Sequence, residues 1–249
     1  MLAIDIGNTN ITAGIFEGSE LIEVFRMPTQ ECIDTSAFIS KIPEFRKKMA
    51  HDSVMVSVRR DATRILMSEI ENATGKKPIL VNMDTTLGIT VAYDTKETLG
   101  MDRLVCADAA FHLYGQKNRP LVVIDMGTAT TIDYVTEEGV FIGGMIAPGI
   151  MSAYEGLLAA APQLPRVDNL FVGDLIGATT MDCVRSGVVL GHACMIRKAV
   201  ELMAARSSSG AVVVLTGGPA ALVTKGFPET YITDKHLILK GLCRLATLS

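Results

Sequence analysis

Hydrophobic and polar positions along the chain follow two periods, one typical of strands and one typical of helices. Short apolar runs alternate with longer stretches in which apolar residues recur at helical spacing, and this pattern predicts an α/β protein. We expect strands at 1–6, 11–16, 20–27, 53–58, 78–81, 121–125 and 211–215. We expect helices at 35–49 with a kink at Pro43, at 61–74 and 101–113, after Pro148-Gly149, and at 179–206 and 237–248.

The sequence at the start of the chain recurs 120 positions later, so that Asp5, for example, matches Asp125. LAIDIGNTNITAGIFEGSELI, starting at Leu2, aligns with VVIDMGTATTIDYVTEEGVFI, starting at Val122. Both segments contain an apolar strand, an acidic turn, a second strand, a Glu/Gly turn and a third strand. This repeat indicates an internal duplication. We therefore predict two halves, residues 1–115 and residues 116–249.

Each copy carries an acidic loop directly after its first strand. The first loop is Asp5-Ile6-Gly7-Asn8-Thr9-Asn10, and the second is Asp125-Met126-Gly127-Thr128-Ala129-Thr130-Thr131. Glycine allows close backbone approach, and hydroxyl and amide groups donate to phosphate oxygens. A carboxylate repels phosphate, so each aspartate would act through a metal ion. For one loop alone, a hairpin whose aspartate satisfies turn amides stays an open alternative. Two loops in matching positions favour a triphosphate held between them.

Two further motifs bear on the chemistry. Thr216-Gly217-Gly218 ends an apolar strand, where paired glycines allow close approach to a base or phosphate; a tight βα turn is the alternative. Gly100-Met101-Asp102-Arg103 lies at the start of a predicted helix. Its Asp102 could be a helix cap in a surface ion pair, or a general base beside an anion-binding guanidinium. Periodicity does not decide between these roles.

Charge and cysteine content narrow the class of protein. The net charge of −4 and the scattered cations argue against a broad nucleic-acid surface. The five cysteines lack CxxC spacing and predict neither a disulfide framework nor a zinc site, and we expect Cys183 and Cys194 to be small core residues. There is no leader-like N-terminus and no apolar run of roughly 20 residues. We expect a cytoplasmic protein without a nucleic-acid or membrane partner.

The ordered motifs resemble the type III pantothenate kinase family, within the actin-like, sugar-kinase and heat-shock-chaperone ATPase superfamily. DIGNTN, GMDR, DMGTATTID, GGMIAPGI and LTGG occur in this order along essentially the whole chain. The resemblance implies a duplicated actin-like (ribonuclease H-like) α/β fold, with two mixed-sheet halves flanking a nucleotide cleft. It also implies ATP-dependent phosphorylation of pantothenate to 4'-phosphopantothenate, the first step of coenzyme A biosynthesis. No Walker-type GxxxxGK[ST] motif is present in the sequence.

The same resemblance implies roles for individual residues. Asp102 would be the catalytic base, Asp125 would bind K⁺ or NH₄⁺, and Asp5 would hold Mg²⁺ through water. Thr180 would contact the substrate near the interface of a homodimer; the apolar segment 184–195 is a candidate interface or, equally, a core helix. The ATP-binding residues would be Asp5, Ile6, Gly7, Asn8, Thr9, Asn10, Ile11, Thr12, Thr128, Gly217 and Gly218. The pantothenate-binding residues would be Tyr93, Gly100, Met101, Asp102, Arg103 and Thr180.

Two other functions remain open from the sequence. Another kinase or a phosphohydrolase of the superfamily would share both loops, although GMDR together with Thr180 argues against it. A non-catalytic regulatory descendant would keep the fold and lose the chemistry. The presence of Asp5, Asp102 and Asp125 argues against that descendant, and no helix-turn-helix pattern with a basic recognition helix stands out.

Overall fold

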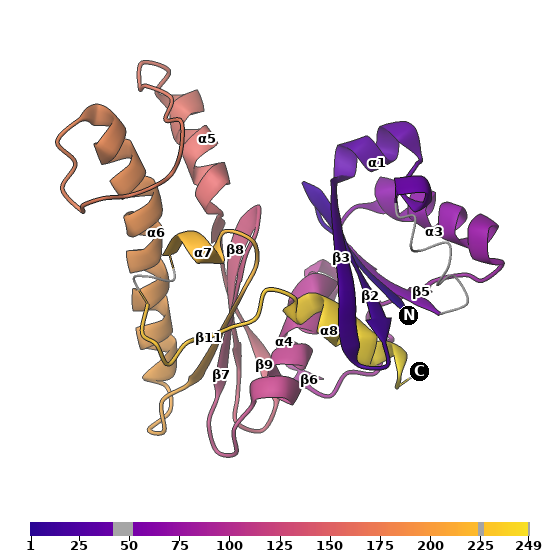
Figure 1. The fold of residues 1–249 in the computed structure, drawn as a ribbon. Helices are drawn as coiled ribbons and strands as arrows, with labels where there is room; N and C mark the ends of the chain where they lie inside the picture. Colours follow the sequence, from indigo (N-terminus) through magenta and orange to yellow (C-terminus); the bar gives the residue numbers. More distant parts are fainter. Residues whose placement is uncertain (42–51, 224–226, 249) are drawn as a thin grey trace. The chain divides into compact units, whose positions relative to one another are not determined.

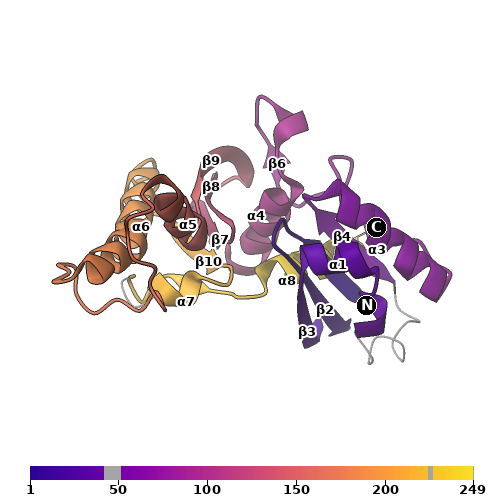
Figure 2. The ribbon, with the colours of Figure 1, turned by 90° about the horizontal axis from the view of Figure 1, so that it is seen from above.

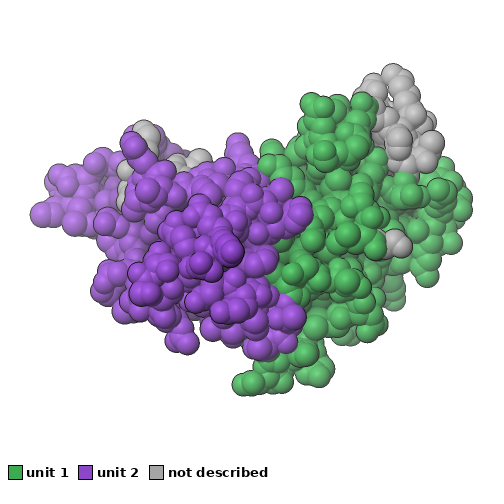
Figure 3. Space-filling view, turned by 90° about the horizontal axis from the view of Figure 1, so that it is seen from below, with its two compact units in different colours: residues 1–89, 93–109, 236–249 green, residues 90–92, 110–235 purple. Residues whose placement is uncertain are grey.

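The chain forms two compact units in the computed structural model, which describes residues 1–41, 52–223 and 227–248 (Figure 3). Unit 1 comprises Met1–Ile89, Tyr93–Ala109 and His236–Ser249, and unit 2 comprises Thr90–Ala92 and Ala110–Lys235. The halves predicted from the internal duplication, residues 1–115 and 116–249, divide the chain by sequence and not by contacts. That division stays a prediction. The two copies of the strand triplet fall in different units, one in each.

Unit 1 is built on a five-stranded mixed sheet with the order β3-β2-β1-β4-β5 (Figure 1). Its strands are β1 (Leu2–Ile6), β2 (Asn10–Glu17), β3 (Glu20–Pro28), β4 (Ser53–Ser57) and β5 (Ile79–Leu80). β1 pairs antiparallel with β2 and parallel with β4. Its helical elements are α1 (Thr29–Thr35), η1 (Ile39–Lys41), α3 (Arg60–Thr74), η2 (Lys96–Thr98), most of α4 (Met101–Tyr114) and α8 (Leu237–Ala246).

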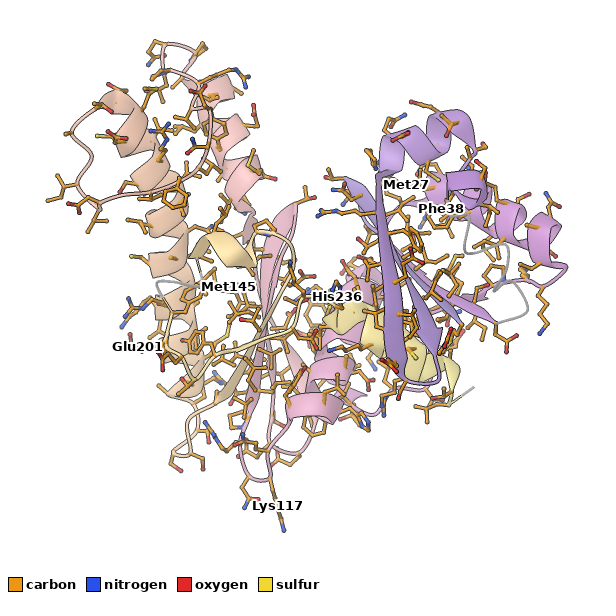
Figure 4. The ribbon with its side chains drawn as sticks, viewed as in Figure 1. Met27, Phe38, Lys117, Met145, Glu201 and His236 are labelled. Atoms are coloured by element: carbon orange, nitrogen blue, oxygen red, sulfur yellow. The ribbon has the colours of Figure 1, made fainter. Side chains whose placement is uncertain are left out.

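Two apolar clusters lie on opposite faces of this sheet, because successive side chains of a strand point to opposite sides. Ile4 and Ile6 of β1 belong to the cluster that α1 and α3 cover, together with Met27 and Phe38 (labelled in Figure 4). Ala3 belongs to the other cluster, which is formed with side chains of α4 and α8. Burial on both faces explains why β1 reads as a continuous apolar run with a single polar position.

Unit 2 is built on a six-stranded mixed sheet with the order β11-β10-β7-β8-β9-β6. Its strands are β6 (Thr90–Val91), β7 (Leu121–Met126), β8 (Ala129–Val135), β9 (Val140–Pro148), β10 (Val212–Thr216) and β11 (Ile232–Thr233). The helices are α5 (Ile150–Ala160), α6 (Thr180–Ala204) and α7 (Ala220–Val223). α5 and α6 lie side by side (Figures 1 and 2) and share one apolar core with β7, β8 and β10, against which Met145 packs.

The predicted strands are confirmed within a few residues, and so are the predicted helices, with one exception. The helix predicted at 35–49 is wrong for its first part: α1 ends at Thr35, Ser36 adopts the left-handed conformation with φ 44°, and only the short turn η1 follows. Pro28 ends β3 and lies at the N-cap position directly before α1, so this helix begins at Thr29, six residues earlier than predicted. The remainder of that predicted helix, with its kink at Pro43, lies outside the described residues.

The core assignment of two cysteines is also wrong. Cys183 and Cys194 are exposed on α6, because the buried stripe of that helix runs through Val184, Val188 and Val189. The apolar segment 184–195 therefore contributes this stripe to the core of unit 2. Across the parts of the chain that the structure describes, every helix is too short or too polar to traverse a lipid bilayer.

Candidate active site

The first acidic loop joins β1 to β2 through a tight turn. Asp5 lies opposite Thr12 in the antiparallel register, so that their side chains share one face of the sheet. The Gly7 N–H donates to the Asn10 carbonyl at 3.0 Å. A Cβ atom at Gly7 would lie 2.9 Å from that carbonyl oxygen, so a larger residue would open the turn. Asn8, at the tip of the turn, is exposed.

Most of the ATP-binding residues predicted in this region lie on or beside the turn, but two of them lie in the core. Ile6 and Ile11 are completely buried in unit 1, which leaves their backbone as the part that could contact a nucleotide.

The second loop has the same construction in unit 2. Asp125 lies opposite Thr131 of β8 and Thr216 of β10, which places three oxygen-bearing side chains on one face of three adjacent strands. Such an oxygen-rich set suits a hard cation. No group of three His, Cys, Asp or Glu side chains that could hold a metal ion occurs among the described residues. A cation here would therefore be held by one carboxylate with hydroxyl, carbonyl or water oxygens.

A buried hydrogen bond joins the strand after this loop to α6. Thr130 is fully buried, and its hydroxyl lies 2.9 Å from Nε2 of His192. Burial lowers the pKa of His192, because the protein interior disfavours the charged imidazolium. The neutral ring is therefore the partner of Thr130.

The TGG motif lies beside the second loop. β10 pairs in parallel with β7, and Gly217 follows its last residue with a φ of +92°. A Cβ atom at Gly217 would lie 2.2 Å from the Met126 carbonyl oxygen. Only glycine satisfies both constraints. Asp125, the turn at Gly127-Thr128 and the TGG motif are thus brought together within unit 2.

The Gly100–Arg103 tetrad begins α4 in unit 1. The Asp102 carboxylate accepts a hydrogen bond from the Arg103 N–H at 3.0 Å, and burial raises the pKa of this carboxyl above its ordinary value. A Cβ atom at Gly100 would lie 2.4 Å from Oδ1 of Asp102, so the glycine provides the space that the carboxylate occupies. Arg103 is buried, and its guanidinium carbon lies 5.9 Å from the centre of the Tyr93 ring.

The structure thus brings together Tyr93, Gly100, Asp102 and Arg103 of the predicted substrate site. Thr180 is the exposed first residue of α6 in unit 2, where the Thr179 hydroxyl caps the helix by accepting from the Asp182 N–H. The substrate-binding role of each of these residues stays a prediction.

Three residues that no motif indicated contact the two loops. Thr29 and Arg59 donate hydrogen bonds to carbonyls of the first loop, and Ser152 donates to a carbonyl of the second. The repeat contained one available signal: each third strand ends in proline, at Pro28 and Pro148, and the residue after it faces the loop.

A strand triplet with an acidic Gly/Thr loop, present once in each unit, defines an α/β protein of the actin-like ATPase and sugar-kinase fold. A ROK family glucokinase from Streptomyces griseus, solved with glucose and AMPPNP, matches with a TM-score of 0.54 and 13% identity, covering 100% of this chain and 98% of that one. A protein of Campylobacter jejuni assigned to the Baf family of transcriptional activators matches with a TM-score of 0.64 and 22% identity, again covering 100% and 98%. Both likenesses show the fold alone.

Comparison of sequences narrows this class to one family. Residues 1–202 match the family model described as type III pantothenate kinase. The type III pantothenate kinase of Moorella thermoacetica is 35% identical over 97% of this chain and 96% of its own length. The chain belongs to the type III pantothenate kinase family, and the resemblance drawn from the ordered motifs is confirmed.

Proposed function

We propose that this chain transfers the γ-phosphoryl group of ATP to the terminal hydroxyl of pantothenate, giving 4'-phosphopantothenate in the first step of coenzyme A biosynthesis. The observation that carries the proposal is the gathering of Tyr93, Gly100, Asp102 and Arg103 at the start of α4. This gathering occurs in a chain that belongs to the family and keeps both acidic loops.

Asp102 is the proposed catalytic base. Its carboxylate accepts the proton of the substrate hydroxyl while that oxygen attacks the γ-phosphorus; the bond from phosphorus to the bridging oxygen breaks, and ADP leaves with the electron pair. A pKa raised by burial makes the carboxylate a better proton acceptor. Arg103, whose guanidinium lies near Tyr93, suits the carboxylate of pantothenate. Met101 lines the same site in this proposal.

The two loops would position the triphosphate. Phosphoryl transfer depends mainly on positioning and on neutralising the charge of the phosphate oxygens. Asp125, flanked by Thr131 and Thr216, would hold the monovalent cation, K⁺ or NH₄⁺, and Asp5 would hold Mg²⁺ through water. Such cations neutralise phosphate charge when bound. The proposed ATP contacts are those predicted from the motifs: 5–12, Thr128, Gly217 and Gly218.

Homodimeric assembly and a cytoplasmic location are further parts of the proposal. Phe171, Leu175 and Ile176, just before α6, are 74%, 64% and 84% exposed. Apolar side chains this exposed support an interaction surface, and Thr180 follows them closely in the chain. All five cysteines are free thiols, which supports a reducing compartment. A regulatory descendant without catalysis would have little reason to keep Asp5, Asp102 and Asp125.

The test is an ADP-release assay with pantothenate as acceptor, in buffers that contain either K⁺ or Na⁺. We expect pantothenate-dependent release of ADP, together with a product whose mass exceeds that of pantothenate by one phosphoryl group. A protein that binds ATP and yet forms no phosphopantothenate in either buffer would refute the proposed function.

A further inference from the structure

Hydrogen bonds from residues outside the first acidic loop hold three of its carbonyl oxygens. The Gly7 carbonyl accepts from the Thr29 hydroxyl at 2.8 Å, and the Thr9 carbonyl accepts from the Thr29 N–H at 2.9 Å. The Asn8 carbonyl between them accepts from the Arg59 guanidinium at 3.3 Å. Three consecutive carbonyl oxygens of the loop are therefore held by two residues.

Both of these residues are themselves fixed in position. Thr29 is completely buried at the first position of α1. Arg59 donates from Nε and from a terminal nitrogen to the two carboxylate oxygens of Asp61, at 3.0 and 2.6 Å. Its own carbonyl accepts from the Thr63 hydroxyl at 2.7 Å. The guanidinium keeps the pKa of Asp61 well below its ordinary value, so this pair stays ionised around neutral pH.

The second loop is held in a corresponding way. The Thr128 carbonyl accepts from the Gly149 N–H at 2.9 Å and from the Ser152 hydroxyl at 2.6 Å. Gly149 follows Pro148 at the end of β9, as Thr29 follows Pro28 at the end of β3, again at the offset of 120 positions. In both copies the helix after the third strand thus begins against the loop (Figure 1).

These contacts determine which edge of each peptide unit faces away from the protein. The described residues contain no cis peptide bond, and in a trans peptide the C=O and the N–H point in opposite directions. Holding the Gly7 and Asn8 carbonyls against Thr29 and Arg59 therefore turns the N–H groups of Asn8 and Thr9 the other way. An anion is attracted by N–H groups and repelled by carbonyl oxygens.

We propose that Thr29, Arg59 and Ser152 are positioning residues, which hold the carbonyl oxygens of the two loops and so keep the loops' N–H groups turned towards the triphosphate. The inference rests on the proposed function only in requiring that the loops bind ATP. The identity of the phosphoryl acceptor does not enter it.

The decisive variant is Thr29→Val, which keeps the size and the backbone N–H and removes the hydroxyl. We expect the Kd of a non-hydrolysable ATP analogue and the KM for ATP to rise about tenfold, the effect of one lost hydrogen bond, with the KM for pantothenate unchanged. Thr29→Ser should restore wild-type values. Thr74→Val is the matched control, since Thr74 also donates to a carbonyl, that of Ile70 at 2.7 Å, elsewhere in unit 1.

The other two contacts are tested by Arg59→Met and Ser152→Ala. We expect each to weaken analogue binding several-fold, whereas Arg60→Met, at the exposed neighbouring position, and Ser40→Ala, which removes a hydroxyl bonded to the Ala37 carbonyl, should leave it unchanged. Circular dichroism and urea unfolding establish that each variant is folded.

Wild-type affinity for the analogue in folded Thr29→Val and Ser152→Ala would overturn the inference. If the wild-type protein binds the analogue but does not phosphorylate pantothenate, the proposed function fails. The ratio of analogue affinities between variant and wild type still decides the role of these residues in that case.

Discussion

The ion pair between Asp108 and Arg244 joins the last helix to α4 within unit 1. Asp108 lies six residues after Asp102 on α4, and its side chain is completely enclosed. Its two carboxylate oxygens accept from the Gly88 N–H and from the Arg244 guanidinium of α8. The Arg244 side chain keeps 21% of its surface exposed. Water can therefore solvate the Arg244 guanidinium if its partner is lost, but it cannot reach the Asp108 carboxylate.

This inequality predicts different losses for the two single variants. Removing one partner of a buried ion pair costs about 3–5 kcal/mol, because the other charge loses its oppositely charged partner in the protein interior. Arg244→Met leaves an enclosed carboxylate, and we expect a loss of about 4 kcal/mol. Asp108→Asn leaves a guanidinium that can turn towards water, and we expect a loss of about 2 kcal/mol. In the double variant Asp108→Asn/Arg244→Met the loss should be smaller than the sum of the two single losses.

The measurement is urea unfolding followed by circular dichroism, with hydrogen exchange of unit 1 amides to separate the two units. Lys76→Met is the control, because the ion pair of Lys76 with Asp52 is largely exposed and should contribute little. If Arg244→Met costs less than Asp108→Asn, or no more than Lys76→Met, the reasoning from burial is refuted.

Three further predictions concern the site and its surroundings. Asp102→Asn should abolish phosphoryl transfer in the ADP-release assay. Because burial places the folded-state pKa of Asp102 above the unfolded value, its carboxylate destabilises the fold at neutral pH. Urea unfolding of this variant should therefore show equal or greater stability, and wild-type turnover would refute the base assignment. His192 has a folded-state pKa below the unfolded value of about 6.5. The contribution of the neutral ring to folding stability is therefore complete above that pH, and the stability declines as the pH falls below it. His192→Gln should reduce this decline in unfolding experiments at pH 7.5 and 5.5, and an unchanged decline would contradict the prediction. Turnover should rise steeply when K⁺ replaces Na⁺, and Asp125→Asn should remove the difference; equal rates in both salts would argue against a cation at Asp125.

The strand triplets could be predicted from sequence because local signals determine them. Alternation of apolar and polar positions locates each strand, and the constant offset between Asp5 and Asp125 locates the second copy. The partner of the last helix could not be predicted in this way. Periodicity shows that α8 has an apolar face, but not that this face packs in unit 1 with β1 and β4. That choice depends on contacts between residues far apart in the chain.

The candidate site was predictable to a similar extent. The loops and the tetrad carry short motifs whose residue types suit phosphate and proton chemistry. The space that Gly100 leaves for Asp102, the guanidinium of Arg103 near Tyr93 and the contact of Thr29 with the first loop are three-dimensional facts. Thr29 lies 22 positions after Gly7, and the only hint in the sequence is that both third strands end in proline, at Pro28 and Pro148; the hydrogen bond itself is visible only in the structure.

The unequal exposure of the cysteines gives this protein natural attachment points for probes. Burial raises the pKa of Cys32 to about 12 and also raises that of Cys243, so neither forms a reactive thiolate readily, and Cys106 is buried as well. Cys183 and Cys194, by contrast, are exposed on the same helix, α6. A thiol-specific spin label or dye would therefore report on the surroundings of α6 without any change to the sequence.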